Sequence, residues 1–272
     1  MQDELHTRER LSAIGHAMAS VGHCMKNMLT GLKGGVFLLE RTMEDTKDSR
    51  LSDAHLLLSR STSRINLLLL NMLDLSRERR AGAVLTSVQG ILDETVQVIR
   101  AGLAVERENG KEVEIQARLD PAIPMVRLDP ERLYRALLNL GLNATDAMPS
   151  GGRLLFETRG TSAQEVEASL TGGFDAPDST LDPAWRFVVM RGSQLSSVRH
   201  LRIDIRDNGT GIDPENLQQL FRPFFSTKSS KGTGLGLAAV CQFVTEHDGH
   251  ILVLSALNHG TRFTLFLPES SE

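Results

Sequence analysis

A carboxylate at the end of an apolar strand face is the strongest chemical signal in this sequence. Alternation predicts a strand over 201–206, whose alternate apolar side chains share one face with Asp207. A buried carboxylate without a partner is costly, so Asp207 needs a hydrogen-bond donor, which the amino group of an adenine would supply. Gly209 and Gly211 follow and permit positive φ angles and close approach of the backbone to a ligand. A second interpretation stays open, in which Asp207 accepts backbone hydrogen bonds within a turn.

A second glycine-rich run, residues 232–236, opens an apolar-faced helix that is predicted to end near Gly249. Backbone N–H groups at a helix N-terminus attract anions, and glycines let phosphate oxygens approach closely. Lys228 and Lys231 lie just upstream, where they are long enough to reach a β- or γ-phosphate. The run lacks the Gly-Lys-Ser/Thr ending of a P-loop, so by itself it is weak evidence. The residues expected to contact a nucleotide here are Thr233, Gly234, Leu235 and Gly236.

A third segment adds two amides. The helix expected to begin at Asp129 and Pro130 carries a polar stripe that includes Asn139 and Asn143. Two asparagines one turn apart can offer amide oxygens to one cation without adding charge. This suits Mg²⁺ that phosphates already neutralise, because Mg²⁺ prefers oxygen ligands and keeps several waters. For this helix alone a solvated polar face is the simpler interpretation, and it is the order of the three segments that favours one nucleotide site.

His23 is a candidate acceptor for a phosphoryl group. A neutral imidazole is a competent nucleophile toward a γ-phosphoryl group, which requires mainly positioning and charge neutralisation. His16 lies on the same face of the predicted N-terminal helix. A lone helical histidine is more often an ordinary surface or core side chain, so spacing alone does not choose between the two.

The elements that position these residues fall into two halves. Residues 1–80 contain no proline, and their apolar residues recur at helical spacing, which predicts two long helices. Two helices alone leave apolar stripes uncovered, so we expect a homodimer that forms a four-helix bundle; a hairpin packed on its own C-terminal domain is the alternative. Alternating helices and short strands over 84–272 predict an α/β two-layer sandwich, so the chain is assigned to the α+β class. Residues 160–199 match no recognisable pattern and are interpreted as an insertion with one strand or short helix.

Composition restricts the classes of partner. The net charge is −4 and 40% of the residues are hydrophobic, so there is no electrostatic case for binding nucleic acid or a membrane surface. Aromatic residues make up 4%, too few for a base-stacking platform. Cys24 and Cys241 lie far apart without metal-binding spacing, which fits a reducing cytoplasm. No apolar run reaches membrane-spanning length, so any membrane sensor is expected outside this chain.

Taken in order, these segments resemble the sensor histidine kinases of two-component systems, whose ATPase domain belongs to the gyrase/Hsp90/kinase/MutL superfamily. The resemblance covers nearly the whole chain except 160–199. The run Met148–Gly152 is typical of the nitrogen-regulation and oxygen-sensing branch. The matching motifs are an H box at 14–30, an N box at 129–144, a G1 box at 207–212, an F box at 221–228, a G2 box at 232–237 and a closing strand at 260–268.

The resemblance implies an ATP site with named residues. Asn143 would be the principal Mg²⁺ ligand, with Asn139 in support. Asp207 would bind the adenine amino group, and Gly211 would line the base pocket. Residues 221–233 would form a mobile lid that orders on nucleotide. The phosphates would be bracketed by Gly234 and Gly236.

The resemblance also assigns the H box. His23 would be the phosphoacceptor, a response regulator receiver domain would be the partner, and Asn27 would be placed to orient a water that dephosphorylates the receiver aspartate. Cys24 departs from the family pattern, which has an acidic residue directly after the histidine to orient or deprotonate the ring. Met28 replaces the usual proline, so the helix is expected to bend less there.

Three functions follow from these residues. The first is an ATP-dependent protein-histidine kinase, and the second is an ATP-binding module that acts mainly as a response-regulator phosphatase or docking partner. The third, a chaperone- or gyrase-like ATPase clamp, is disfavoured because such enzymes use glutamate as a base where this chain has Asn139, and a neutral amide cannot accept a proton from water.

Overall fold

The computed structural model describes residues 28, 30–32, 34–35, 37, 58, 65, 82–106, 112–123, 125–172, 185–192, 198–228 and 232–270. The chain divides into two compact units, one formed by Met1–Arg77 with Phe221–Ala238 and the other by Glu78–Leu220 with Ala239–Glu272. The predictions for His23, Asn27 and Lys231 lie outside the described residues.

In the first unit, the described residues of the N-terminal segment are helical: Met28, 30–32, Gly34, Gly35, Phe37, Leu58 and Ile65. The two long helices that the sequence predicts over 1–80 lie mostly outside the described residues and stay a prediction. The dimeric four-helix bundle stays a prediction.

The second unit is built on a six-stranded sheet with the order β2-β4-β6-β8-β7-β5. β2 runs parallel to β4, and every other neighbouring pair is antiparallel. A separate antiparallel pair is formed by β1 and β3. The strands are β1 Val84–Thr86, β2 Val113–Leu119, β3 Val126–Leu128, β4 Gly152–Thr161, β5 Arg186–Met190, β6 His200–Asp207, β7 His250–Ala256 and β8 Gly260–Pro268.

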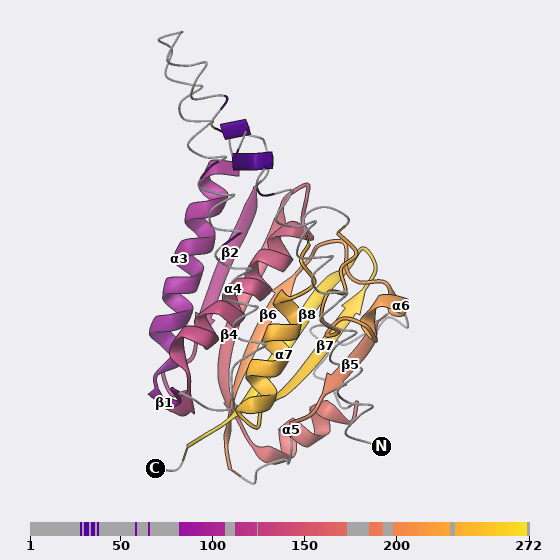
Figure 1. Ribbon diagram of the computed structural model, residues 1–272. Coiled ribbons are helices and arrows are strands. Elements are labelled where there is room, and N and C mark those ends of the chain that lie inside the picture. The colour runs from indigo at the N-terminus through magenta and orange to yellow at the C-terminus, as the bar shows by residue number, and fades with distance from the viewer. Residues whose placement is uncertain are drawn as a thin grey trace, which may run out of the picture. The chain divides into compact units, whose positions relative to one another are not determined.

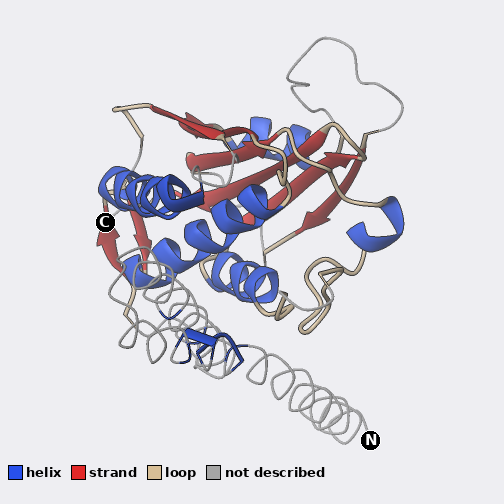
Figure 2. Cartoon of the chain, turned by 90° about the horizontal axis from the view of Figure 1, so that it is seen from above, coloured by secondary structure: helices blue, strands red, loops and turns tan. Residues whose placement is uncertain are grey.

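Three helices cover one face of this sheet: α3 Val88–Glu106, α4 Pro130–Asp146 and α7 Gly236–Glu246 (Figure 1). Figure 2 shows the same helices, in blue, along one side of the red strands. A short helix, α6 Pro214–Leu217, follows β6. The two-layer arrangement confirms the predicted α/β sandwich. Its core between the layers includes Leu133, Leu137, Leu140, Leu154, Phe156, Ile203, Ile205 and Leu265.

The start of α4 is fixed as the sequence predicts. Asp129 has an extended backbone, and its carboxylate accepts hydrogen bonds from the N–H groups of Glu131 and Arg132, both at 3.1 Å. Further along, Gly141 lets α4 approach its neighbours, because a Cβ there would lie 2.3 Å from Cδ1 of Ile99 and 3.2 Å from Cζ of Phe156. The helix that carries the two asparagines is therefore held at its start by a cap and at its middle by close packing on α3 and β4.

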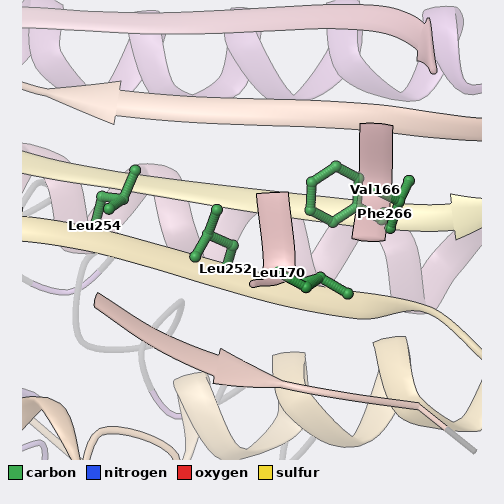
Figure 3. Close-up of a cluster of buried hydrophobic side chains, with 5 residues drawn as sticks. All are labelled: Val166, Leu170, Leu252, Leu254 and Phe266. Atoms are coloured by element: carbon green, nitrogen blue, oxygen red, sulfur yellow. The ribbon is translucent and has the colours of Figure 1, made fainter. Parts of the chain in front are cut away.

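The insertion contributes an edge strand to the sheet and a helix on its opposite face. It holds β5, which the sequence predicts as one strand or short helix, and also α5 Ala163–Leu170, which the sequence does not predict. Ser162 and Glu165 form a capping box at the start of α5. Figure 3 shows the buried cluster that attaches this helix to the sheet, formed by Val166 and Leu170 of α5 with Leu252, Leu254 and Phe266.

Candidate nucleotide-binding site

Asp207 ends β6, where the sequence places it, and its residue is only 4% exposed. It lies beside Leu154 of β4 and Thr261 of β8. The N–H of Gly209 donates to its Oδ1 at 2.8 Å. Burial raises the pKa of Asp207 to about 6, although backbone hydrogen bonds from Gly209 and Thr261 oppose the shift. The turn interaction that the sequence left open is thus present, yet it does not compensate for the desolvation of the carboxylate, and a further donor would stabilise the ionised form.

The loop after Asp207 is held between the end of α4 and the turn that joins β7 to β8. The N–H of Thr210 donates to the carbonyl of Ala147 at 2.9 Å, and the Thr210 carbonyl accepts from the N–H of Asn258 at 2.8 Å. Gly209 lies so close to α4 that a Cβ would be 2.4 Å from the Ala147 oxygen. Gly211 has a φ of +69°, whereas Gly209 is required for the close approach and not for a positive φ. The aspartate therefore sits in a backbone frame that is built from three elements of the second unit.

Replacing Gly211 with alanine is expected to destabilise the second unit by about 2 kcal/mol or more, because the left-handed φ is unfavourable for alanine. Its Cβ would also lie 2.0 Å from the backbone oxygen of Ala256, which has no freedom to rotate away. Gly90→Ala in α3 is the matched control, since nothing lies within 4 Å of a Cβ there, and it is expected to stabilise the chain by about 0.5–1 kcal/mol. Thermal unfolding of both variants checks this, and equal melting temperatures would contradict the expectation.

Two buried hydroxyl groups support this frame and were missed at the level of sequence. Ser255 of β7 accepts the N–H of Ile212 at 2.9 Å, donates to the carbonyl of Gly260 at 3.0 Å and lies 2.9 Å from the hydroxyl of Thr261. The available signal was a serine at the end of the otherwise apolar run Ile251–Leu254. Ser255 and Thr261 hold the loop after Asp207 to the two C-terminal strands.

The two asparagines lie on one side of α4, a single turn apart, as the sequence predicts. Asn139 is buried and Asn143 is half-buried. Among the described residues no group of three or more histidine, cysteine or acidic side chains could hold a metal ion. The amide oxygens of the two asparagines, together with oxygens of a ligand and water, form a donor set that fits Mg²⁺.

The second glycine-rich run belongs to the first unit. Gly234 has a φ of +66°, and its carbonyl accepts the N–H of Phe224 at 2.9 Å. A Cβ on Gly234 would lie 2.3 Å from the carbonyl carbon of Phe224, which itself has a φ of +67°. The side chain of Thr233 accepts the N–H of Leu235 at 3.2 Å, and Gly236 is the first residue of α7. The run is thus a tight loop that opens a helix, the arrangement that anion binding requires.

Two further residues of this loop were predicted as nucleotide contacts. Lys228 is half-buried, and its N–H donates to the hydroxyl of Ser226 at 3.1 Å. The side chain of Leu235 is fully buried with Met28 in an apolar cluster that also contacts Ile65 and Phe224. Only the backbone of Leu235 is therefore available to a ligand.

The fold and these motifs define a class of protein. The chain belongs to the histidine kinase-, DNA gyrase B-, and HSP90-like ATPase family, whose model matches residues 128–271. That range contains both asparagines, Asp207 and the two glycine-rich runs.

Curated proteins that are similar to this chain include sensor histidine kinases. Sensor histidine kinase ZraS of Escherichia coli O157:H7 is 28% identical over 269 residues, which are 98% of this chain and 49% of the relative. Signal transduction histidine-protein kinase AtoS of Escherichia coli K12 is 28% identical over 267 residues, 98% of this chain and 37% of the relative. The chain thus spans about half the length of ZraS.

Solved structures share the fold. Histidine kinase ThkA, in complex with the response regulator protein TrrA, aligns with a TM-score of 0.58 at 20% identity and covers 99% of this chain and 66% of ThkA. Full-length ShkA in complex with AMPPNP aligns with a TM-score of 0.54 at 20% identity, over 94% of this chain and 46% of ShkA. Within the part of the chain that the structure describes, no helix is long and apolar enough to cross a membrane.

Proposed function

We propose that this chain is the kinase core of a two-component system, which transfers the γ-phosphoryl group of ATP to His23 and then to an aspartate of a response regulator. The observation that carries the proposal is the buried carboxylate of Asp207, which is held by the backbone frame of the second unit and whose pKa burial raises to about 6 despite two backbone hydrogen bonds. The exocyclic amino group of adenine is a donor of the right kind, whereas guanine presents a carbonyl oxygen at the same position. Base identity is therefore assigned to Asp207, with Gly209 and Gly211 beside the base.

The phosphate side of the proposed site uses the remaining predicted residues. Asn143, supported by Asn139, would hold Mg²⁺, which neutralises phosphate charge when bound. Lys228 and Lys231 would neutralise the β- and γ-phosphates. Backbone N–H groups that bind phosphate come from the loop of Thr233, Gly234, Leu235 and Gly236 at the start of α7.

The proposed chemistry is an in-line displacement on phosphorus. A ring nitrogen of His23 forms a bond to the γ-phosphorus while the bond to the bridging oxygen breaks, and ADP leaves. The ring proton passes to a base. Cys24 follows His23 where the family has an acid, and a neutral thiol with an ordinary pKa near ~8.5 is a poor base, so a slow first step is part of the proposal.

The partners follow from the same relatives. ThkA was solved in complex with a response regulator protein, which supports a receiver domain as the partner of this chain. The uncovered apolar stripes of residues 1–80 support a homodimer. We further propose that the chain belongs to the nitrogen-regulation and oxygen-sensing branch of these kinases and that it acts in the cytoplasm.

A labelling experiment tests it. Purified chain incubated with ATP labelled at the γ-position and Mg²⁺ is expected to acquire label that survives alkali and is lost in acid, as a phosphoramidate does. Addition of a chelator should prevent labelling. Label that resists acid would point to a hydroxyl ester and contradict a histidine acceptor.

Asn143→Ala is expected to weaken binding of Mg²⁺–AMPPNP by about 10-fold, because one oxygen ligand of the cation is removed. Binding of ADP in the presence of a chelator should change by less than about 2-fold. Calorimetry under both conditions measures the two effects. The exposed neighbour Asp146 supplies the control, and Asp146→Ala should leave both affinities unchanged; an equal loss in the two conditions for Asn143→Ala would contradict the metal role.

The second candidate, a module biased toward phosphatase or docking functions, is favoured by Cys24. In that case the chain binds ATP without acquiring label and accelerates loss of phosphate from a phosphorylated receiver domain, with Asn27 orienting the attacking water. The labelling experiment separates the two functions.

A further inference from the structure

Two histidines that have no role in the proposed ATP site are buried at one end of the sheet, on the face that carries α5. His200 begins β6 and is fully buried, and His250 begins β7 and is 2% exposed. Their ring centres are 6.4 Å apart. His250 lies opposite Phe266 of β8, which belongs to the buried cluster that attaches α5 (Figure 3). The pair therefore lies where the insertion meets the sheet, and both residues belong to the second unit.

His250 is bonded to the chain that leaves the edge strand β5. The backbone N–H of Gly192, two residues beyond the end of β5, donates to Nδ1 of His250 at 3.0 Å. Gly192 packs so closely on the α7–β7 turn that a Cβ would lie 2.6 Å from the carbonyl oxygen of Gly249. Because a backbone N–H can only donate, the ring is neutral with its proton on Nε2, and that buried nitrogen has no hydrogen-bond partner among the described residues. The hydrogen bond to Gly192 therefore exists only while His250 is uncharged.

The same junction is bonded to α5. Arg191, which precedes Gly192, donates to the carbonyl of Leu170 at the end of α5 at 3.4 Å. Its guanidinium also lies 3.4 Å from the carboxylate of Glu167, and both side chains of this ion pair are about half exposed. Such an exposed pair contributes little to stability. The buried bond between Gly192 and His250 is thus the stronger polar attachment of the junction to the sheet.

A charge on His250 is unfavourable in these surroundings. Burial lowers the pKa of His250, and the charges of His200 and Arg191 act in the same direction. Glu167 of α5 and Asp248 of the α7–β7 turn oppose the shift. The folded chain therefore favours the neutral ring. The resulting stabilisation is complete above the ordinary histidine pKa of 6.5 and is lost as the pH falls below that value.

Protonation of His250 would place a second donor opposite the N–H of Gly192 and a charge beside a second buried imidazole. Burial lowers the pKa of that second ring, His200, as well, against an opposing contribution from the Val198 backbone. We propose that His250 and His200 form a pH-sensitive latch, which holds β5 and α5 on the sheet while both rings are neutral and releases them when the rings gain protons. The latch is independent of the proposed ATP site.

Hydrogen exchange of the full chain at pH 7.5 and pH 5.5 tests the latch. Protection of the β5 and α5 amides, corrected for the intrinsic exchange rate, should fall by about 10-fold for each ring that gains a proton on release, and so by about 100-fold for the pair. Protection of the β4 amides should stay unchanged. These expectations apply to the unaltered chain.

Substitutions separate the two rings. His250→Asn keeps an acceptor near the Nδ1 position without a titrating group, and His200→Phe keeps a ring of similar size. Each should reduce the fall to about 10-fold, and the double variant should show none. His259→Asn is the matched control, because it removes an exposed histidine from the β7–β8 turn and should leave the fall at about 100-fold.

Three results would overturn the latch. Equal losses of protection in β5 and β4 would mean that acid unfolds the whole unit, and an undiminished fall in the double variant would mean that other groups titrate. If His250→Asn does not fold, His200→Phe alone must reduce the fall by about 10-fold, and an unchanged fall in that variant would be the third.

Discussion

With asparagine in place of Asp207, the chain is expected to bind ATP about 10- to 100-fold more weakly, the loss that accompanies removal of a buried charge-assisted hydrogen bond. The substitution is nearly isosteric. The N–H of Gly209 donates to the carboxylate of Asp207 at 2.8 Å in the unaltered chain, and the amide oxygen of asparagine can still accept this hydrogen bond. The backbone around the site is therefore retained. The amide nitrogen, however, opposes the amino group of adenine donor to donor. Calorimetric titration with ATP measures the effect.

The same variant should change base preference. Hypoxanthine carries an oxygen where adenine carries the amino group, and the Asp207→Asn amide can donate to it. The ratio of ATP affinity to inosine triphosphate affinity should therefore fall or invert in Asp207→Asn. A uniform loss for both nucleotides would mean that Asp207 supports the loop and does not contact the base.

A pH dependence accompanies this prediction. The pKa of Asp207 is raised from its ordinary value of 3.8 to about 6 by burial, so the folded chain without nucleotide binds this proton more tightly than the unfolded chain does. The stabilisation from that protonated form is fully present below the unfolded pKa and is lost as the pH rises through about 6. Nucleotide binding has the opposite sign, because the adenine amino group requires the ionised carboxylate. Affinity at pH 5.5 should be about 4-fold lower than at pH 7.5. Asp207→Asn should lack this component, and an unchanged profile in that variant would contradict the assignment.

Substitution of His23 by glutamine is expected to abolish labelling from γ-labelled ATP, because an amide cannot act as the nucleophile toward phosphorus. Affinity for ATP should stay within about 2-fold of the unaltered value, since the proposed nucleotide site contains no H-box residue. His16→Gln is the matched control, because His16 shares the predicted helix face with His23. Retention of label in His23→Gln together with its loss in His16→Gln would show that His16, and not His23, is the acceptor.

Much of the second unit around the predicted nucleotide residues could be predicted, because these residues follow strong local rules. The alternation of β6 placed Asp207 on the apolar face, and the structure finds it buried there. Asp129 and Pro130 fixed the first turn of α4, and this in turn fixed Asn139 and Asn143 on one side of the helix. Both signals are contained within a few neighbouring residues.

Other features depend on contacts between distant segments. His247 and Asp129 are joined across 118 positions, so neither spacing nor composition could relate them. α5 was missed because its apolar stripe is short, and it is stabilised by Leu252, Leu254 and Phe266 from the far end of the chain. Leu235 was predicted as a nucleotide contact, and the packing that buries its side chain against Met28 is likewise invisible along the sequence.

The attachment of α5 to the face of the sheet away from α4 has a pharmacological consequence. A ligand directed at the nucleotide residues meets a set of motifs that this chain shares with its whole family, so discrimination between relatives is difficult there. Val166 and Leu170 lie in the segment outside the recognised motifs, and both side chains are buried against the sheet. A compound that displaced this helix would act on the face of the sheet away from α4, and so away from the predicted nucleotide residues of that helix.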